Sequence, residues 1–107
     1  MKALRFYAPG DVRLEDVPEP TCGPREVKIK VKNCSTCGTD VKIRNNGHVN
    51  ITRVTTMGHE VAGEVVEVGA EARGGFTVGD RVQCIAAVPC GDCYECGKGW
   101  MEVCQNQ

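Results

Sequence analysis

Four cysteines near the end of the 107-residue chain have the spacing of a metal site. Cys90, Cys93 and Cys96 recur at every third position, and Cys104 follows after seven intervening residues. Four thiolates complete a tetrahedral zinc site and leave no position for a reactant. The spacing therefore predicts a structural zinc in a lobe at about residues 86–107, where the few apolar side chains need the metal in order to fold.

Two other chemistries compete for these cysteines. An iron–sulfur run of the bacterial type ends with a shorter gap and Cys-Pro, whereas Cys104 follows a longer gap and precedes Gln105. Disulfides would have to join near neighbours such as Cys90 and Cys93, in a chain whose first residues lack the apolar run of a signal peptide. Both comparisons favour zinc.

A second, incomplete set of candidate ligands lies upstream. Cys37 offers a thiolate, His59 an imidazole and Glu60 a carboxylate that could ligate a metal or lie just behind it. Asp40 is placed to accept the other imidazole N–H and fix its tautomer. No obvious fourth protein ligand accompanies them. A catalytic zinc needs such an open position, where the substrate can bind. Spacing alone leaves a catalytic metal site and a hydrogen-bonded core histidine both open.

The remaining cysteines have simpler interpretations. Cys34 and Cys37 form a C-x-x-C pair, but a zinc ribbon with Cys90 would need a spacer of about 15–20 residues, and the chain has more than fifty. A redox pair usually opens a helix in an α/β pattern, which the sequence lacks. We therefore expect Cys34, Cys22 and Cys84 to be buried thiols.

Short strands must position these groups. Alternation of apolar residues with lysines makes residues 27–31 the clearest strand, and Val-rich residues 61–68 indicate another. Thr39 or Asp40 could cap a helical turn that ends at Asn45-Asn46-Gly47. The other expected elements are a hairpin of residues 1–7 and 12–17 and a last strand at 81–85. Frequent Gly and Pro turns with little helix predict a mainly β barrel or sandwich.

Composition limits the class of protein. A chain of 107 residues is enough for one domain with one modest core. The net charge of −1, with both signs scattered, gives no footprint for nucleic acid or an anionic membrane. No apolar run approaches the ~20 residues that span a bilayer. We expect a soluble protein of a reducing cytoplasm.

Several motifs together resemble one enzyme family, the zinc-dependent medium-chain alcohol, sorbitol and threonine dehydrogenases, in their amino-terminal part. They are Cys37-Gly-Thr-Asp40, Gly58-His59-Glu60-x-x-Gly63 ending at Gly69, Val78-Gly79-Asp80-Arg81-Val82, and the four-cysteine lobe. The resemblance implies a mainly β, GroES-like β-barrel with short helical turns. It also implies a catalytic zinc on Cys37 and His59 with Glu60 as ligand or neighbour, a structural zinc on the lobe, and Thr39 as the hydroxyl that relays the substrate's proton.

Two departures from the family limit what the resemblance implies. Lys42 stands where many relatives place a relay histidine, and no G-x-G-x-x-G follows a strand. We therefore interpret residues 1–107 as one truncated GroES-like catalytic domain, inactive alone, with the Rossmann domain absent.

The parent enzyme would transfer hydride between an alcohol, polyol or amino alcohol and NAD or NADP, as a homo-oligomer. The alternative is a stand-alone, non-enzymatic zinc-binding GroES-like module.

Overall fold

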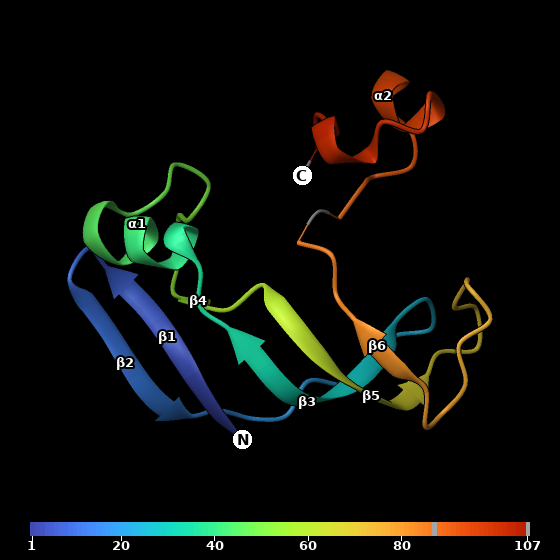
Figure 1. Cartoon of the computed structure of the whole chain (residues 1–107), viewed down its shortest axis with the longest axis horizontal. Coiled ribbons are helices and arrows are strands. Elements are labelled where there is room, and N and C mark those ends of the chain that lie inside the picture. Colours follow the sequence, from blue (N-terminus) through green and yellow to red (C-terminus); the bar gives the residue numbers. More distant parts are fainter. Residues whose placement is uncertain (87, 107) are drawn as a thin grey trace.

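Two three-stranded antiparallel sheets carry most of the regular structure (Figure 1). The structure is a computed structural model, and it describes residues 1–86 and 88–106. The first sheet has the order β2-β1-β4, with bounds Asp11–Asp16, Lys2–Ala8 and Thr55–Thr56. The second has the order β3-β5-β6, with bounds Val27–Ser35, Glu60–Val68 and Arg81–Gln83. The prediction of a mainly β fold is confirmed.

The first sheet is built on a hairpin. β1 and β2 pair from Lys2↔Asp16 to Ala8↔Asp11, and the turn between them contains Gly10 at a φ of 79°. Glycine adopts this left-handed conformation without steric cost, which is why the turn can be tight. The short strand β4 joins the other edge of β1 through Arg5↔Thr56. The predicted hairpin is confirmed, and β4 was not foreseen.

The second sheet pairs the two longest strands. β3 and β5 run antiparallel from Val27↔Val68 to Ser35↔Glu60, with two irregularities along the ladder. Gly63 lies where the strands approach closely, because a Cβ there would collide with the backbone carbonyl of Lys30. β6 covers only three residues, so the last strand is shorter than the five expected at 81–85.

Helices occupy the connections. α1 (Gly38–Asn46) follows β3 directly, while α2 (Tyr94–Gly97) and a 3₁₀ turn, η1 (Met101–Val103), form the cysteine lobe. The residue that caps α1 is Cys37, so the expected cap at Thr39 or Asp40 is wrong. Figure 1 shows the lobe standing away from both sheets.

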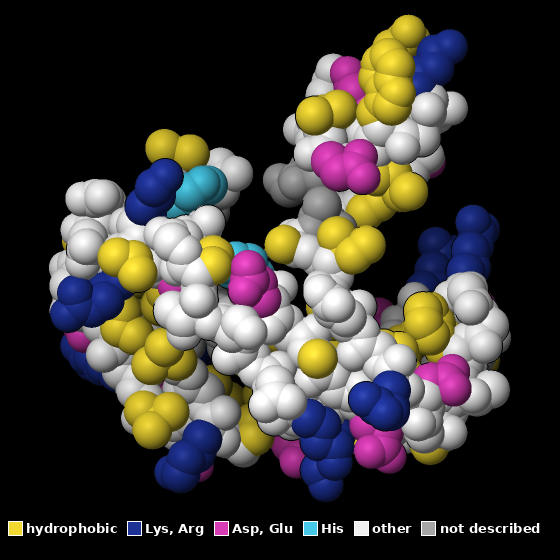
Figure 2. All heavy atoms as spheres, in the orientation of Figure 1, with side chains coloured by type: hydrophobic (Ala, Val, Ile, Leu, Met, Phe, Trp, Pro, Cys, Tyr) yellow, Lys and Arg dark blue, Asp and Glu magenta, His cyan; other side chains and the backbone are white. Residues whose placement is uncertain are grey.

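The hydrophobic core is small. Within the described residues, the buried apolar side chains are Ala3, Phe6, Val65 and Cys104. The radius of gyration of 15.3 Å exceeds the ~13 Å typical of a compact domain of this length. Apolar side chains are visible over much of the surface, including the lobe (Figure 2). The two sheets do not close into a barrel, because the short strands β4 and β6 cannot provide the continuous ladder that closure needs.

The small core also leaves two cysteines exposed. Cys34 and Cys84 are exposed rather than buried, and Cys22 is half-buried. The expectation of buried thiols is therefore wrong for Cys34 and Cys84, since no described helix or strand packs extensively over the β3-β5-β6 sheet. Across the described residues, no helix is both long and apolar enough to cross a membrane.

Candidate metal centres

Cys37 and His59 are brought together by the pairing of β3 with β5. Ser35 is the partner of Glu60 in this antiparallel ladder. Cys37 lies two residues beyond the end of β3, and His59 lies one residue before the start of β5. In an antiparallel pair the end of one strand lies beside the start of the other, so the two side chains meet at the same edge of the sheet.

The thiol of Cys37 is held by the start of α1. Its Sγ accepts a hydrogen bond from the Thr39 N–H at 3.3 Å, and its own N–H donates to Asp40 Oδ2 at 2.9 Å. This reciprocal arrangement is a capping box, which satisfies backbone donors that a helix start otherwise leaves unpaired. The helix therefore fixes the position of Cys37 and aims Asp40 into the same site.

His59 is delivered by a glycine turn. The Met57 N–H donates to the Leu4 carbonyl at 2.8 Å, which attaches the segment to β1. Gly58 then turns the chain at a φ of 103°, and a Cβ on it would lie 2.7 Å from Cys34 Sγ. Both the backbone angle and the close sulfur require glycine at this position.

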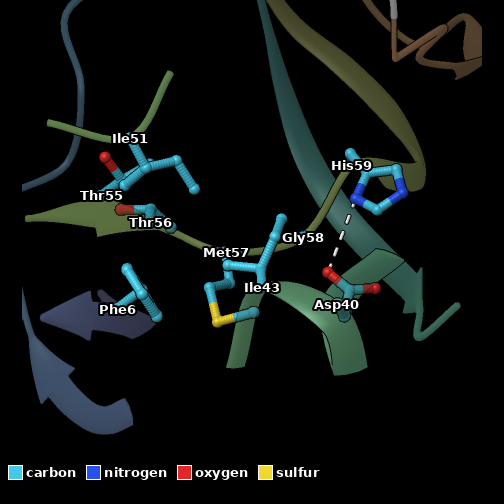
Figure 3. A pocket seen from close by; sticks show the side chains of 9 residues that line it. All are labelled: Phe6, Asp40, Ile43, Ile51, Thr55, Thr56, Met57, Gly58 and His59. Carbon is cyan, nitrogen blue, oxygen red and sulfur yellow. Dashed lines mark ion pairs between the residues drawn. The ribbon is translucent and has the colours of Figure 1, made fainter. Parts of the chain in front are cut away.

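The three side chains form one hydrogen-bonded group. His59 Nε2 lies 3.1 Å from Cys37 Sγ, and His59 Nδ1 lies 3.5 Å from Asp40 Oδ1, as Figure 3 shows for the carboxylate. Asp40 is buried, with 8% of its surface exposed. The carboxylate therefore faces the ring nitrogen that points away from the thiol, where it holds the imidazole with Nε2 free to bind a metal.

This donor set fits a zinc ion. The candidate ligand atoms of Cys37, Asp40 and His59 lie within 4.8 Å of one another. Tetrahedral zinc would hold the sulfur and Nε2 about 3.5 Å apart, so the observed 3.1 Å needs only a small separation of the pair. Thiolate and imidazole are ligands that zinc prefers, and two protein ligands leave positions for other groups.

Two of the predicted site residues lie at the border of this group. Thr39 is exposed in the first turn of α1, next to Cys37. Glu60 is exposed at the first position of β5 and is not part of the group of candidate ligands found among the described residues. Its role as a ligand stays a prediction, and Lys42 is an exposed residue of α1.

A cavity of about 170 Å³ adjoins Asp40 and His59 (Figure 3). Its walls are mainly apolar and include Phe6, Ile43 and Met57. An apolar surrounding strengthens the interaction between a carboxylate and an imidazole, because little water competes for either group. The cavity therefore supports the pairing of Asp40 with His59.

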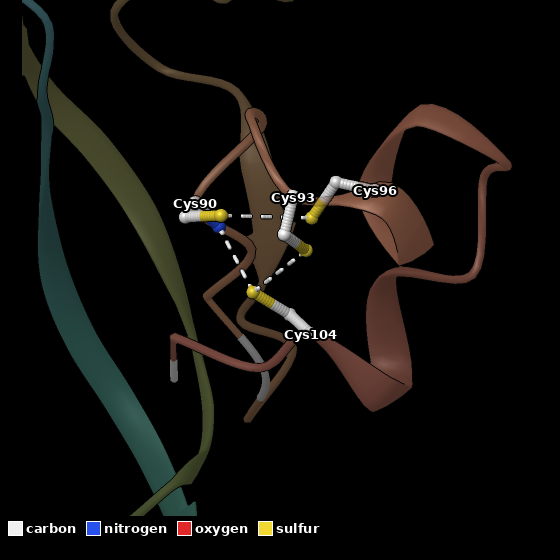
Figure 4. A group of neighbouring side chains, drawn as sticks. All are labelled: Cys90, Cys93, Cys96 and Cys104. Carbon is white, nitrogen blue, oxygen red and sulfur yellow. Dashed lines mark hydrogen bonds between the residues drawn. The ribbon is translucent and has the colours of Figure 1, made fainter.

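The four lobe cysteines converge on one point. Their sulfur atoms lie within 4.8 Å of one another. Figure 4 shows the four side chains pointing toward one another. The separation is 4.0 Å between Cys90 Sγ and Cys96 Sγ and 3.9 Å between Cys93 Sγ and Cys104 Sγ. Tetrahedral zinc with bonds of about 2.3 Å would place any two sulfurs about 3.8 Å apart. The sulfur cluster therefore has the dimensions of a four-thiolate zinc site.

N–H groups surround these sulfurs. Cys104 Sγ accepts from the N–H groups of Cys90 at 3.3 Å and of Asn106 at 3.4 Å, and the Asn106 side-chain amide approaches Cys90 Sγ at 3.6 Å. The backbone of Asp92, followed by the Asn106 amide, lowers the pKa of Cys90 to about 6. This favours the thiolate, the form that binds zinc. This role of Asn106 was not predicted from the sequence. The available signal was its position two residues after the ligand candidate Cys104.

The opposite effect operates on Cys96. A hydrogen bond from the Gly91 backbone lowers the pKa of its thiol, but burial and the neighbouring thiols outweigh that bond and raise the pKa to about 12. The neighbouring thiols of the cluster therefore compete for negative charge. Cation binding relieves this competition by stabilising all four thiolates at once.

The structure does not support two other interpretations of the cysteines, disulfides in the lobe and a zinc ribbon. All eight cysteines are free thiols, so no disulfide staples the lobe. Among the described residues, Cys37 groups with Asp40 and His59 and not with the lobe cysteines, which is inconsistent with a zinc ribbon formed by both C-x-x-C pairs.

Comparisons with known proteins agree with this arrangement. The family model of the alcohol dehydrogenase GroES-like domain matches residues 23–107. L-threonine 3-dehydrogenase of Serratia proteamaculans is 40% identical over 99% of the chain, and that of Pyrococcus furiosus is 49% identical over 85%. The chain spans 32% and 26% of these two proteins, respectively.

Solved structures show the same likeness. A putative zinc-binding dehydrogenase from Sinorhizobium meliloti bound to NADP has a TM-score of 0.86 and 32% identity, covering 98% of the chain and 30% of its own length. The 2R,3R-butanediol dehydrogenase of Bacillus subtilis has a TM-score of 0.69 and 43% identity, covering 77% of the chain and 26% of its own length. The open pair of sheets is thus a GroES-like fold, and the chain belongs to the alcohol dehydrogenase GroES-like domain family.

Proposed function

We propose that this chain is the metal-binding, amino-terminal part of a zinc-dependent oxidoreductase that transfers hydride between an alcohol and a nicotinamide cofactor. The observation that carries the proposal is the 3.1 Å approach of Cys37 Sγ to His59 Nε2 beside a buried Asp40. A purely structural domain has no use for a thiol, an imidazole and a buried carboxylate in one hydrogen-bonded group.

The cofactor and the substrate class follow from the relatives. NADP is bound to one structural neighbour, and the chain contains no dinucleotide fingerprint of its own, so the cofactor would be held by another segment. Threonine and 2,3-butanediol, which name two relatives, both carry a hydroxyl beside a second polar group on the adjacent carbon. We expect a small alcohol of this kind as substrate.

The extent of apolar surface supports a larger protein. Side chains as large as Leu14, Ile85 and Val88 are more than two-thirds exposed. Soluble monomers rarely expose contiguous apolar patches, and such surface commonly packs against other protein. The chain also spans only about a third of its curated relatives. We therefore propose that residues 1–107 form one part of the catalytic domain of a longer enzyme.

Each site residue would have a distinct role. Cys37 Sγ and His59 Nε2 would bind the catalytic zinc, and Asp40 would accept a hydrogen bond from Nδ1–H of His59 and so keep Nε2 unprotonated. The bound ion would supply a Lewis acid that favours the ionised form of the alcohol. The Thr39 hydroxyl would take up the substrate's proton and pass it outward. Glu60 would be a ligand of this zinc or its close neighbour.

The second zinc would be structural. Cys90, Cys93, Cys96 and Cys104 would supply all four of its ligands, so it would take no part in the reaction. Its contribution would be to fold the lobe, where Cys104 is the buried apolar residue.

Metal analysis tests the proposal. We expect about two zinc ions per chain, with one lost in Cys37→Ser and the other lost in Cys104→Ser. The chain alone should not oxidise L-threonine or 2,3-butanediol with NAD or NADP, because it lacks a cofactor site. One zinc in the wild-type chain, fully retained in Cys37→Ser, would contradict the proposal and favour a non-enzymatic zinc module.

A further inference from the structure

Asn106 contacts two sulfurs of the lobe at once. Its backbone N–H donates to Cys104 Sγ at 3.4 Å, and its side-chain Nδ2 donates to Cys90 Sγ at 3.6 Å. These sulfurs belong to different close pairs, because Cys90 approaches Cys96 while Cys104 approaches Cys93. One residue therefore connects both halves of the cluster.

The hydrogen bond from the Asn106 side chain differs from the other N–H hydrogen bonds to the lobe sulfurs. The N–H groups that Cys104 Sγ accepts come from the backbone of Cys90 and of Asn106, so no substitution short of proline removes them. Among the described residues, the Asn106 amide is the side-chain N–H that the structure places on a lobe sulfur. The sequence can therefore tune this hydrogen bond independently of the fold of the lobe.

The physical effect of such a bond is on the sulfur. Four thiolates around one divalent cation carry more negative charge than the ion neutralises. An N–H donor draws electron density from a sulfur lone pair and restricts the side chain, so the ligand is held in position before the metal binds. Groups that hydrogen-bond to metal ligands in this way commonly change metal affinity by about 10–100-fold.

We propose that the Asn106 amide is a positioning residue of the structural metal site, which holds Cys90 Sγ in the cluster and thereby sets how tightly the lobe retains zinc. The inference rests on the proposed zinc site of the lobe and deepens it. It does not depend on the Cys37–His59 site, which carries the dehydrogenase proposal.

The test uses the full 107-residue chain with Cys37→Ser, so that the metal measured is in the lobe. Asn106→Ala removes the donor, and Asn106→Leu removes it with little change of shape and no added charge. The matched control is Gln105→Ala, because the Gln105 amide donates to Glu95 Oε1 at 2.7 Å and not to a sulfur. Zinc transfer to a chromophoric chelator gives the affinity, and cobalt(II) in place of zinc gives a sulfur-to-metal charge-transfer band.

We expect both Asn106 variants to lose zinc affinity by about 10-fold or more and Gln105→Ala to lose less than about 3-fold. The cobalt band should move to lower energy in Asn106→Ala, because a sulfur without the hydrogen bond gives up electrons more readily. Trp100, the single tryptophan of the chain, lies in the lobe, and its fluorescence should show that each metal-loaded variant is folded.

Two outcomes would overturn the inference: wild-type affinity and an unmoved cobalt band in Asn106→Ala, or an equal loss in Gln105→Ala. The dehydrogenase proposal is tested separately, in chains that retain Cys37. It fails if those chains bind no second zinc.

Discussion

Asp40 Oδ1 lies 3.5 Å from His59 Nδ1, and the other oxygen of the same carboxylate accepts the Cys37 N–H at 2.9 Å. One buried carboxylate thus contacts both candidate ligands of the proposed catalytic zinc. It orients the imidazole ring and closes the capping box that fixes the thiol. This double contact makes Asp40 the residue whose replacement should most clearly separate the two proposed metal sites.

Asp40→Asn should weaken zinc binding at the Cys37–His59 site by about 10–100-fold while leaving the lobe site unchanged. The amide retains the shape of the carboxylate but lacks the charge that favours metal binding by His59. Competitive zinc titration of the wild-type and variant chains measures the two affinities. Asp16→Asn is the control, since Asp16 pairs with Lys2 on the surface. Equal affinities in wild type and Asp40→Asn would show that the carboxylate does not hold the ligands.

Gly58→Ala should displace His59 and destabilise the chain by about 1–3 kcal/mol. The φ of 103° strains any side chain, and the new methyl would lie 2.7 Å from Cys34 Sγ. Chemical denaturation and zinc stoichiometry measure both effects.

The control for this change is Gly38→Ala, because a Cβ there meets no atom within 4 Å. Adding Cys34→Ala to Gly58→Ala separates the causes: partial recovery of stability is expected, since the steric contact is relieved and the backbone angle is not. A Gly58→Ala chain as stable as Gly38→Ala would mean that the turn does not need glycine.

Gly63→Ala should destabilise the β3-β5-β6 sheet by about 2 kcal/mol or more, because the new methyl would overlap the Lys30 carbonyl within the ladder. Backbone atoms in a paired strand cannot move aside as a flexible side chain can. Urea denaturation followed by far-ultraviolet circular dichroism measures the change. Gly97→Ala should change stability by less than about 0.5 kcal/mol, since no atom lies near its Cβ position. A stability change in Gly63→Ala as small as in Gly97→Ala would count against the close approach of the strands.

Removal of zinc should unfold the lobe without unfolding the hairpin. Among the described residues of the lobe, Cys104 has the one buried apolar side chain, whereas the hairpin buries Ala3 and Phe6. A chelator should therefore change the fluorescence of Trp100 and leave amide protection of β1 and β2 in place. Hydrogen exchange measured by mass spectrometry resolves the two regions.

The control for zinc removal is Cys84→Ser, because Cys84 is an exposed cysteine outside both metal groups. Its chain should respond to the chelator as the wild type does. A lobe that keeps its protection after zinc removal would contradict this prediction.

Local patterns were sufficient for several features. The hairpin, the strands around residues 27–31 and 61–68 and the helical turn after Cys37 were predicted from alternation, turn residues and caps, and all are present. The N-cap was placed wrongly because a cysteine is not a usual capping residue, although its thiol accepts the Thr39 N–H. The exposure of Cys34 was missed because burial depends on what covers the sheet, which no local pattern encodes.

The sequence by itself determined which groups could bind metal. The lobe cysteines lie within fifteen consecutive positions, so local chain geometry brings them close whatever the rest of the fold does. Tertiary structure decided the other site, where 22 positions separate Cys37 from His59.

That meeting depends on the register that pairs Ser35 with Glu60, and a slip of one residue would turn His59 to the other face of the sheet. In this register Glu60 lies outside the group of Cys37 and His59, and Asp40 supplies the carboxylate of that group. Register is fixed by contacts along whole strands, which is why spacing alone could not decide whether Glu60 joins the group.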